Sequence, residues 1–126
     1  MNTSQNPRIE HCKFENRQCL RFVFKGVLTS QDATQAIEEW TQYFQQHPDE
    51  RFILLWDSLE MTNYEPLARS MWQKTIKQFK HQIDTIWLIT DKIVIKTGAM
   101  IMSHFTSFDI KVVKNEEEIP LKKMQS

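Results

Sequence analysis

Polar side chains that could do chemistry follow three of the predicted strands. They are Asp57, Asp91 and Asn115, which come after the apolar runs 52–56, 85–90 and 110–113. In open α/β sheets, ligands bind beyond the carboxyl ends of the parallel strands, so these residues belong at the expected ligand end. General acid–base catalysis needs a second group within hydrogen-bond reach. The sequence places no histidine beside them, and no serine or cysteine elbow precedes a helix. We therefore expect no enzyme, with a hydrolase-type activity as the alternative.

The two cysteines, Cys12 and Cys19, could form a disulfide, hold a metal or simply pack. A hairpin register in which Phe14 faces Leu20 sorts apolar from polar residues well, and register follows such sorting. That register puts the cysteines on opposite faces, where they cannot bridge. A metal site would need further ligands at suitable spacing, which the four scattered histidines do not supply. We expect ordinary packing, no metal and no cofactor.

Alternation and helical spacing divide the chain into strands and helices. The predicted strands are 9–15, 18–26, 51–57, 85–90 and 110–113, and the predicted helices are 30–47, 65–80, 92–106 and a short closing helix at 116–123. Strands that alternate with helices imply parallel pairing through right-handed crossovers, whereas the short first connection makes the first strand antiparallel. The expected fold is α/β, a single mixed five-stranded sheet with about four helices. Residues 1–8 are expected to be a flexible tail, and 9–126 a single domain.

Local signals set the ends of these elements. Thr29 with Asp32 resembles a capping box before the first helix, and Pro66 suits the first turn of the second. Asp91 is expected to cap the third helix, and Gly26 to end the second strand.

Composition excludes several classes of function. Lysine plus arginine equal aspartate plus glutamate at 16 each, so net charge gives no reason to expect nucleic acid. The two glycines cannot supply a glycine-rich phosphate loop. The first ten residues lack the apolar core of a signal peptide, and no apolar run approaches the ~20 residues of a membrane span. We expect a cytoplasmic protein.

The order of elements resembles the STAS domain, the fold of anti-anti-sigma factors of the SpoIIAA type, and in particular small bacterial SpoIIAA-like (STAS/SEC14-like) proteins. The stretches that carry the resemblance are "FILLWD" at 52–57, "YEPLARSMWQ" at 64–73 and "IWLITDKIVIKTGAMIMSHF" at 86–105. It spans about residues 9–118 and consists of packing patterns more than chemical signatures. It implies a regulatory, protein-binding module.

The chain departs from the family at its switch. Anti-anti-sigma factors carry a phosphorylatable serine at the start of the second helix, where this chain has Asn63, Tyr64, Glu65, Pro66 and Leu67. Ser58 and Thr62 are nearby but are expected in a loop. The resemblance therefore argues for the fold and against that phosphorylation. Glu65 is expected to cap the helix, or to act as a fixed negative charge there.

The third helix is apolar around more than one face. Methionines adapt to varied surfaces, and Gly98 inside a helix costs about 1 kcal/mol relative to alanine, which makes sense if something approaches closely there. The ordinary interpretation is that the second and third helices cover each other. The binding candidates are Asp57, Tyr64, Glu65, Trp72, Gly98, Met100, Met102 and Phe105.

Two functions remain open. The first is a non-enzymatic STAS-like regulatory or interaction module that docks another protein, or itself as a homodimer, through the second and third helices. It predicts an exposed apolar patch. The alternative is a carrier or sensor of a small apolar ligand or lipid, as the SEC14-like side of the resemblance implies. It predicts a cavity of roughly 300–1,000 Å³ between the sheet and the third helix.

Overall fold

A single five-stranded sheet organises the chain, as seen in a computed structural model that describes residues 5–14 and 16–120. Its strands, in spatial order, are β1 (Arg8–Phe14), β2 (Arg17–Leu28), β3 (Phe52–Tyr64), β4 (Ile83–Ile89) and β5 (Ile110–Val113). β1 is antiparallel to β2, and the remaining neighbours are parallel. The predicted mixed sheet is confirmed.

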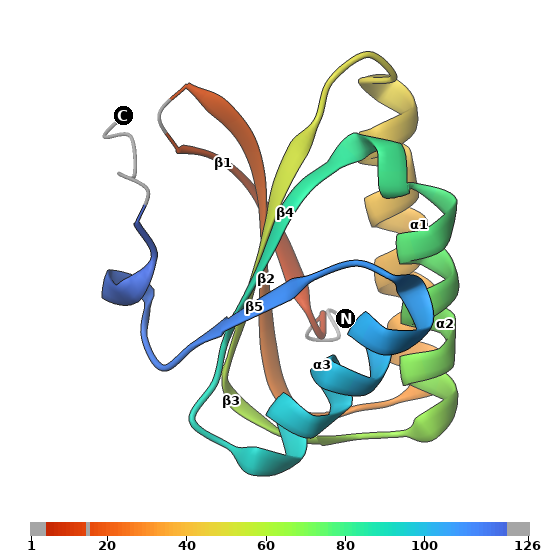
Figure 1. The fold of residues 1–126 in the computed structure, drawn as a ribbon. Coiled ribbons are helices and arrows are strands. Elements are labelled where there is room, and N and C mark those ends of the chain that lie inside the picture. The colour runs from red at the N-terminus through yellow and green to blue at the C-terminus, as the bar shows by residue number, and fades with distance from the viewer. Residues whose placement is uncertain (1–4, 15, 121–126) are drawn as a thin grey trace.

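Three α-helices cover one face of this sheet (Figure 1). They are α1 (Ser30–Gln46), α2 (Pro66–Gln78) and α3 (Ile93–Thr106), and a single 3-10 turn, η1 (Lys80–Gln82), leads into β4. Because each crossover joins neighbouring strands in the same direction, one handedness puts all three helices on the same side. The predicted fourth helix is wrong. The chain there makes only the 3-10 turn η2 (Glu116–Glu118), and residues 121–123 lie outside the described part.

The core between the sheet and the helices is aromatic. Phe22 on β2 meets Trp40 of α1 edge-on, with ring centroids 5.3 Å apart, and Trp72 of α2 at 6.0 Å. Trp40 and Trp72 are 5.4 Å apart, so the two helices share this cluster. Edge-to-face pairs at such distances add stability beyond that of area burial.

The opposite sheet face has a smaller core, covered partly by the segment after β5. It consists of Phe14, Cys19, Ile53, Leu55, Ile89 and Ile119, with Cys12, Trp87 and Val113 packed against it. Figure 1 shows this segment on the side of the sheet away from the helices. The residues of β3 from Phe52 to Trp56 are therefore buried on both faces, as their continuous apolar run predicts.

The predicted hairpin register is wrong. Phe14 pairs with Arg17 across a two-residue turn, so Cys12 lies directly opposite Cys19 and both belong to the same sheet face. Asn16 in the turn has φ 67°, a left-handed conformation that asparagine tolerates. The turn, rather than the sorting of side chains to one face, sets the register.

Both central strands run further than predicted. Gly26 has φ +58° and lies at a register shift, but β2 continues past it to Leu28. β3 continues past Asp57 to Tyr64, which pairs with Leu28. Residues 58–64 are therefore strand rather than loop, because β2 offers them a partner.

The start and stop signals have mixed outcomes. The capping box of Thr29 and Asp32 is present, and α2 begins at Pro66. Asp91 does not cap α3, since the cap position is Lys92 and its side chain makes no capping hydrogen bond. Asn6, inside the predicted tail, exchanges hydrogen bonds of 2.7 and 2.8 Å with the backbone of Lys25, so the ordered chain starts before β1.

Candidate functional site

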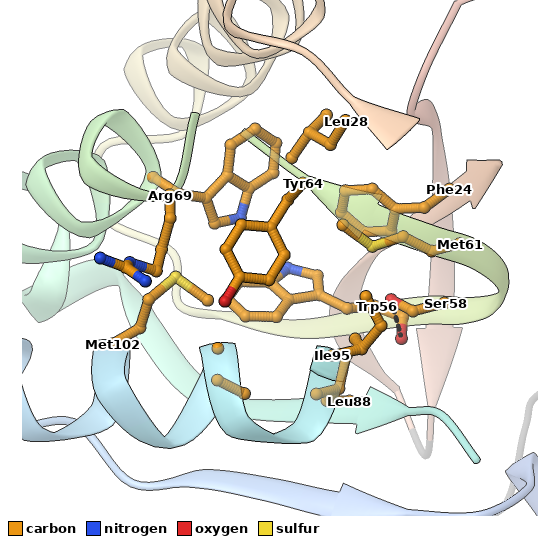
Figure 2. Close-up of a pocket in the computed structure, with 13 residues that line it drawn as sticks. Phe24, Leu28, Trp56, Ser58, Met61, Tyr64, Arg69, Leu88, Ile95 and Met102 are labelled. Carbon is orange, nitrogen blue, oxygen red and sulfur yellow. Dashed lines mark hydrogen bonds between the residues drawn. The ribbon is translucent and has the colours of Figure 1, made fainter. Parts of the chain in front are cut away.

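The far end of β3 forms one wall of the candidate site. Beyond Asp57 the strand carries Ser58, Met61 and Tyr64 toward the starts of α2 and α3. Figure 2 shows the side chains of Met61 and Tyr64 pointing into the space that Ile95 and Met102 of α3 bound from below. The strand extension that the sequence did not predict therefore builds the site.

A small apolar cavity lies at this junction of sheet and helices, with a volume of about 40 Å³. It is lined by Phe24, Leu28, Trp56, Ser58, Met61, Tyr64, Arg69, Trp72, Leu88, Ile95, Gly98, Ala99 and Met102. A water needs roughly 10–15 Å³ of such space, and ligand pockets span about 300–1,000 Å³. As it stands, the cavity suits ordered water and is far smaller than the carrier hypothesis predicts.

Tyr64 fills most of the room that Gly98 leaves. A Cβ built on Gly98 would meet Cε2 and the hydroxyl oxygen of Tyr64 at 2.7 Å, closer than real Cβ contacts come. The guanidinium of Arg69 on α2 lies 5.8 Å from the centre of the same ring, within cation–π range. The predicted close approach at Gly98 is thus confirmed, and the group that approaches is the chain's own tyrosine.

Two donors in the cavity wall have no hydrogen-bond partner. Both Nε1 of Trp56 and Nε of Arg69 are buried and unpaired among the described residues, and Trp56 is 2% exposed. The Ser58 hydroxyl donates only a long bond, 3.5 Å, to the carbonyl of Trp56. Buried donors without acceptors are unfavourable, so these two nitrogen atoms are the unsatisfied polar groups of an otherwise apolar wall.

The structure brings four of the predicted binding residues together and separates the rest. Tyr64, Trp72, Gly98 and Met102 all line the cavity. Asp57 points to the other sheet face, where it accepts a 2.7 Å ion pair from Arg21. Among the described residues, no hydrogen bond or ion pair links Asp57 with Asp91 or Asn115.

Arg21 ties β2 to β3 and to η2. Its second nitrogen pairs with Glu116 at 2.7 Å, and the side chains of Arg21 and Asp57 are only 18% and 20% exposed. Burial acts to lower the pKa of Arg21, but the bonds to Glu116 and Asp57 outweigh it and hold that pKa above its ordinary value. The structure therefore assigns Asp57 to an ion network that joins β2, β3 and η2.

Glu65 occupies the cap position of α2, but its side chain makes no capping hydrogen bond to that helix. Its carboxylate instead accepts a 2.7 Å hydrogen bond from the backbone N–H of Ser30, the first residue of α1. The expected capping is therefore wrong for α2, and the charge stabilises the start of the neighbouring helix.

The outward side of α3 carries four of the seven large apolar residues that are exposed in the described chain; the others are Val27, Leu59 and Leu67. Ile93 is 82% exposed, Met100 60% and Phe105 57%, with Val94 at 42%. The inward side of the same helix is formed by Ile95, Gly98, Ala99, Met102 and Thr106. Met100 and Phe105 are thus surface candidates, whereas Met102 belongs to the cavity. Ile93 and Val94 were missed as candidates, although their apolar type at a helix start was visible in the sequence.

Neither a metal cluster nor a membrane-spanning helix is present in the described part of the chain. No group of three or more histidine, cysteine, aspartate or glutamate side chains there is arranged to hold a metal ion. None of the helices described is both long and apolar enough to cross a membrane.

Comparison with solved structures places this architecture among known folds. A crystal structure of an uncharacterised DUF3478-family protein with a SpoIIAA-like fold, from Shewanella loihica PV-4, superposes with a TM-score of 0.73. The match covers 94% of each chain at 14% sequence identity. The fold is SpoIIAA-like. No family model and no curated protein matches the chain by sequence. At this identity the SpoIIAA-like match establishes the fold alone.

Proposed function

We propose that this SpoIIAA-like chain is a non-enzymatic interaction module that docks another protein through the outward side of α3. We call this surface the α3 face and define it as Ile93, Val94, Met100 and Phe105. The observation that carries the proposal is that four large apolar side chains of one helix are exposed. Large apolar side chains that are exposed together on one element are a feature of protein interaction sites.

The second apolar side of α3 also supports docking. Inward residues such as Ile95 and Ala99 already satisfy the packing of the helix on the sheet. The outward apolar residues are not needed for that packing. Keeping them exposed disfavours solubility, a disadvantage that partner binding would offset.

The docking proposed here is not controlled by a phosphorylatable serine at the start of α2. That position holds Tyr64, Glu65 and Pro66, and the Glu65 carboxylate is engaged by Ser30. The absence of a serine or threonine at this position and the engaged carboxylate of Glu65 both favour constitutive docking over the serine phosphorylation switch.

Site-specific photocrosslinking tests the proposal. A benzophenone amino acid replaces Phe105 in the α3 face, and in the matched control it replaces Gln45, an exposed residue of α1. We expect one dominant adduct from position 105 in cells, to a partner protein or to a second copy, and none from position 45. Met100→Asp should abolish that adduct. Equal crosslinking at both positions, or an adduct that survives Met100→Asp, would contradict docking through the α3 face.

A carrier of a small apolar ligand is the second candidate, supported by the unpaired donors of Trp56 and Arg69 in an apolar cavity. A ligand would fit only if Tyr64 swung away from Gly98, because the cavity is about 40 Å³. Native mass spectrometry of the purified protein separates the candidates. A mass excess lost on denaturation, and absent from a Trp56→Phe variant, would favour the carrier.

A further inference from the structure

The edge hairpin brings the two cysteines together. Cys12 on β1 and Cys19 on β2 are paired residues in the antiparallel register, and both belong to the apolar cluster on the sheet face away from the helices. Directly opposed residues in antiparallel strands have Cα atoms about 4.5–5.5 Å apart. Disulfides span Cα separations of about 4.4–6.8 Å. The backbone therefore already holds the pair at bridging distance.

The two side chains also contact each other. A hydrogen bond with Cys12 is the main cause that raises the pKa of Cys19, and burial adds to it. Both residues are present as thiols. Cys19 is fully buried, whereas Cys12 is half-buried on β1, the edge strand of the sheet. An oxidant in solvent therefore reaches Cys12 more readily than Cys19, which is closed to solvent.

We propose that Cys12 and Cys19 form an oxidative modification site, in which a peroxide closes a cross-strand disulfide between them. In the first step the Cys12 sulfur attacks the peroxide, an S–O bond forms, the O–O bond breaks and water leaves after proton transfer. In the second step the Cys19 sulfur attacks the Cys12 sulfur, the S–S bond forms, and the hydroxyl leaves with the Cys19 proton as water. Two thiols and one hydrogen peroxide give one disulfide and two waters.

The bond would anchor the edge of the sheet. β1 pairs with β2 alone, so its hydrogen bonds can open without disturbing the other strands. A covalent link from Cys12 to Cys19 removes that local opening. The site lies on the sheet face opposite the helices, so oxidation leaves the α3 face unchanged and this inference does not depend on the proposed docking.

Peptide mapping tests the proposal directly. The folded protein is treated with hydrogen peroxide, remaining thiols are alkylated, and trypsin is added without reductant. Cleavage after Arg8, Lys13, Arg17 and Arg21 separates the cysteines into peptides 9–13 and 18–21. We expect these two peptides to appear as one species lighter by two hydrogens than their sum, to separate on reduction, and amide exchange in β1 to slow on oxidation.

Cysteine variants and a denatured control test whether the disulfide depends on the folded hairpin and on both thiols. Protein oxidised in urea should bridge more slowly, because the register no longer opposes the cysteines. Cys12→Ser should leave Cys19 alkylatable only after unfolding, and Cys19→Ala should let dimedone trap a sulfenic acid at Cys12. Recovery of both peptides separately alkylated after peroxide treatment of the folded protein, or overoxidation of Cys12 without a joined species, would overturn the proposal.

Discussion

At the residue scale, the contact between Tyr64 and Gly98 decides the shape of the cavity. The glycine lacks the Cβ that would meet the tyrosine ring at 2.7 Å, so the ring end can lie against the helix. The contact between the two residues is steric, since it depends on the space that the missing Cβ of Gly98 leaves for the Tyr64 ring. Substitutions of Tyr64 and Gly98 should therefore have non-additive effects on the free energy of unfolding.

We expect Gly98→Ala to be neutral or destabilising in the native chain. Alanine favours the helix by about 1 kcal/mol, but its methyl group must displace Tyr64. In a Tyr64→Ala background the same substitution should stabilise by about 1 kcal/mol, because the obstacle is gone. Urea unfolding of the four proteins in this cycle measures the coupling. Equal effects of Gly98→Ala in both backgrounds would show that Tyr64 does not rest on Gly98.

Arg21 is the second residue whose removal should have a defined cost. Arg21→Met leaves the carboxylates of Asp57 and Glu116 together without their cation, at 20% and 35% exposure. We expect a loss of about 1–3 kcal/mol, less than for a fully buried pair. Arg8→Met is the matched control, since its ion pair with Glu10 is about half exposed and should contribute under about 1 kcal/mol. Similar losses from both variants in urea unfolding would contradict the role given to the Arg21 network.

At the element scale, α3 has two apolar sides with different tasks. Met102 lines the cavity and is half-buried, while Met100, two positions earlier, is 60% exposed. The sequence alone could not separate them, because both methionines belong to one continuous apolar segment. Only the position of the sheet beneath the helix assigns each its side.

We expect Met100→Asp to change the unfolding free energy by less than about 0.5 kcal/mol. Met102→Asp should cost several times more, since it places a carboxylate in an apolar wall. Thermal and urea unfolding of the two variants make the comparison, and they differ only in the side of the helix that is altered. A large destabilisation by Met100→Asp would move Met100 into the core and remove it from the α3 face.

The elements were predictable where one hydrophobic periodicity ran along the segment. They were not predictable where a distant packing or pairing partner determined the structure. The apolar stripe of α1 and the continuous run of β3 identified those elements. The hairpin register failed because Phe14 and Cys19 face a second core, so sorting all apolar residues to one face was misleading. Residues 58–64 mix polar and apolar side chains without a clear alternation, yet pairing with β2 keeps them in a strand. Tyr64 over Gly98 joins residues far apart in sequence, a contact that local pattern does not encode.

At the scale of the whole molecule, the sheet is covered unequally. Three helices cover one face, whereas the other depends on its own side chains and on the segment after β5 (Figure 1). Ile119 in this segment is 6% exposed and packs on the second core, and Glu116 binds Arg21. This segment, where a fourth helix was predicted, therefore covers part of this face without forming an α-helix.

Truncation of Ile119 to alanine tests whether the segment after β5 stabilises this face, and truncation of the exposed Ile93 is the matched control. Ile119 is 6% exposed and Ile93, in the α3 face, is 82% exposed. Truncating a buried isoleucine typically costs about 2–5 kcal/mol, and we expect the lower end because the second core is small. Ile93→Ala should stay within about 0.5 kcal/mol. The Ile119 variant should also speed amide exchange in β3 and β4, as water reaches the second face. If both variants unfold at the same urea concentration as the parent, the segment after β5 does not hold that face, and the side chains of the sheet must protect it alone.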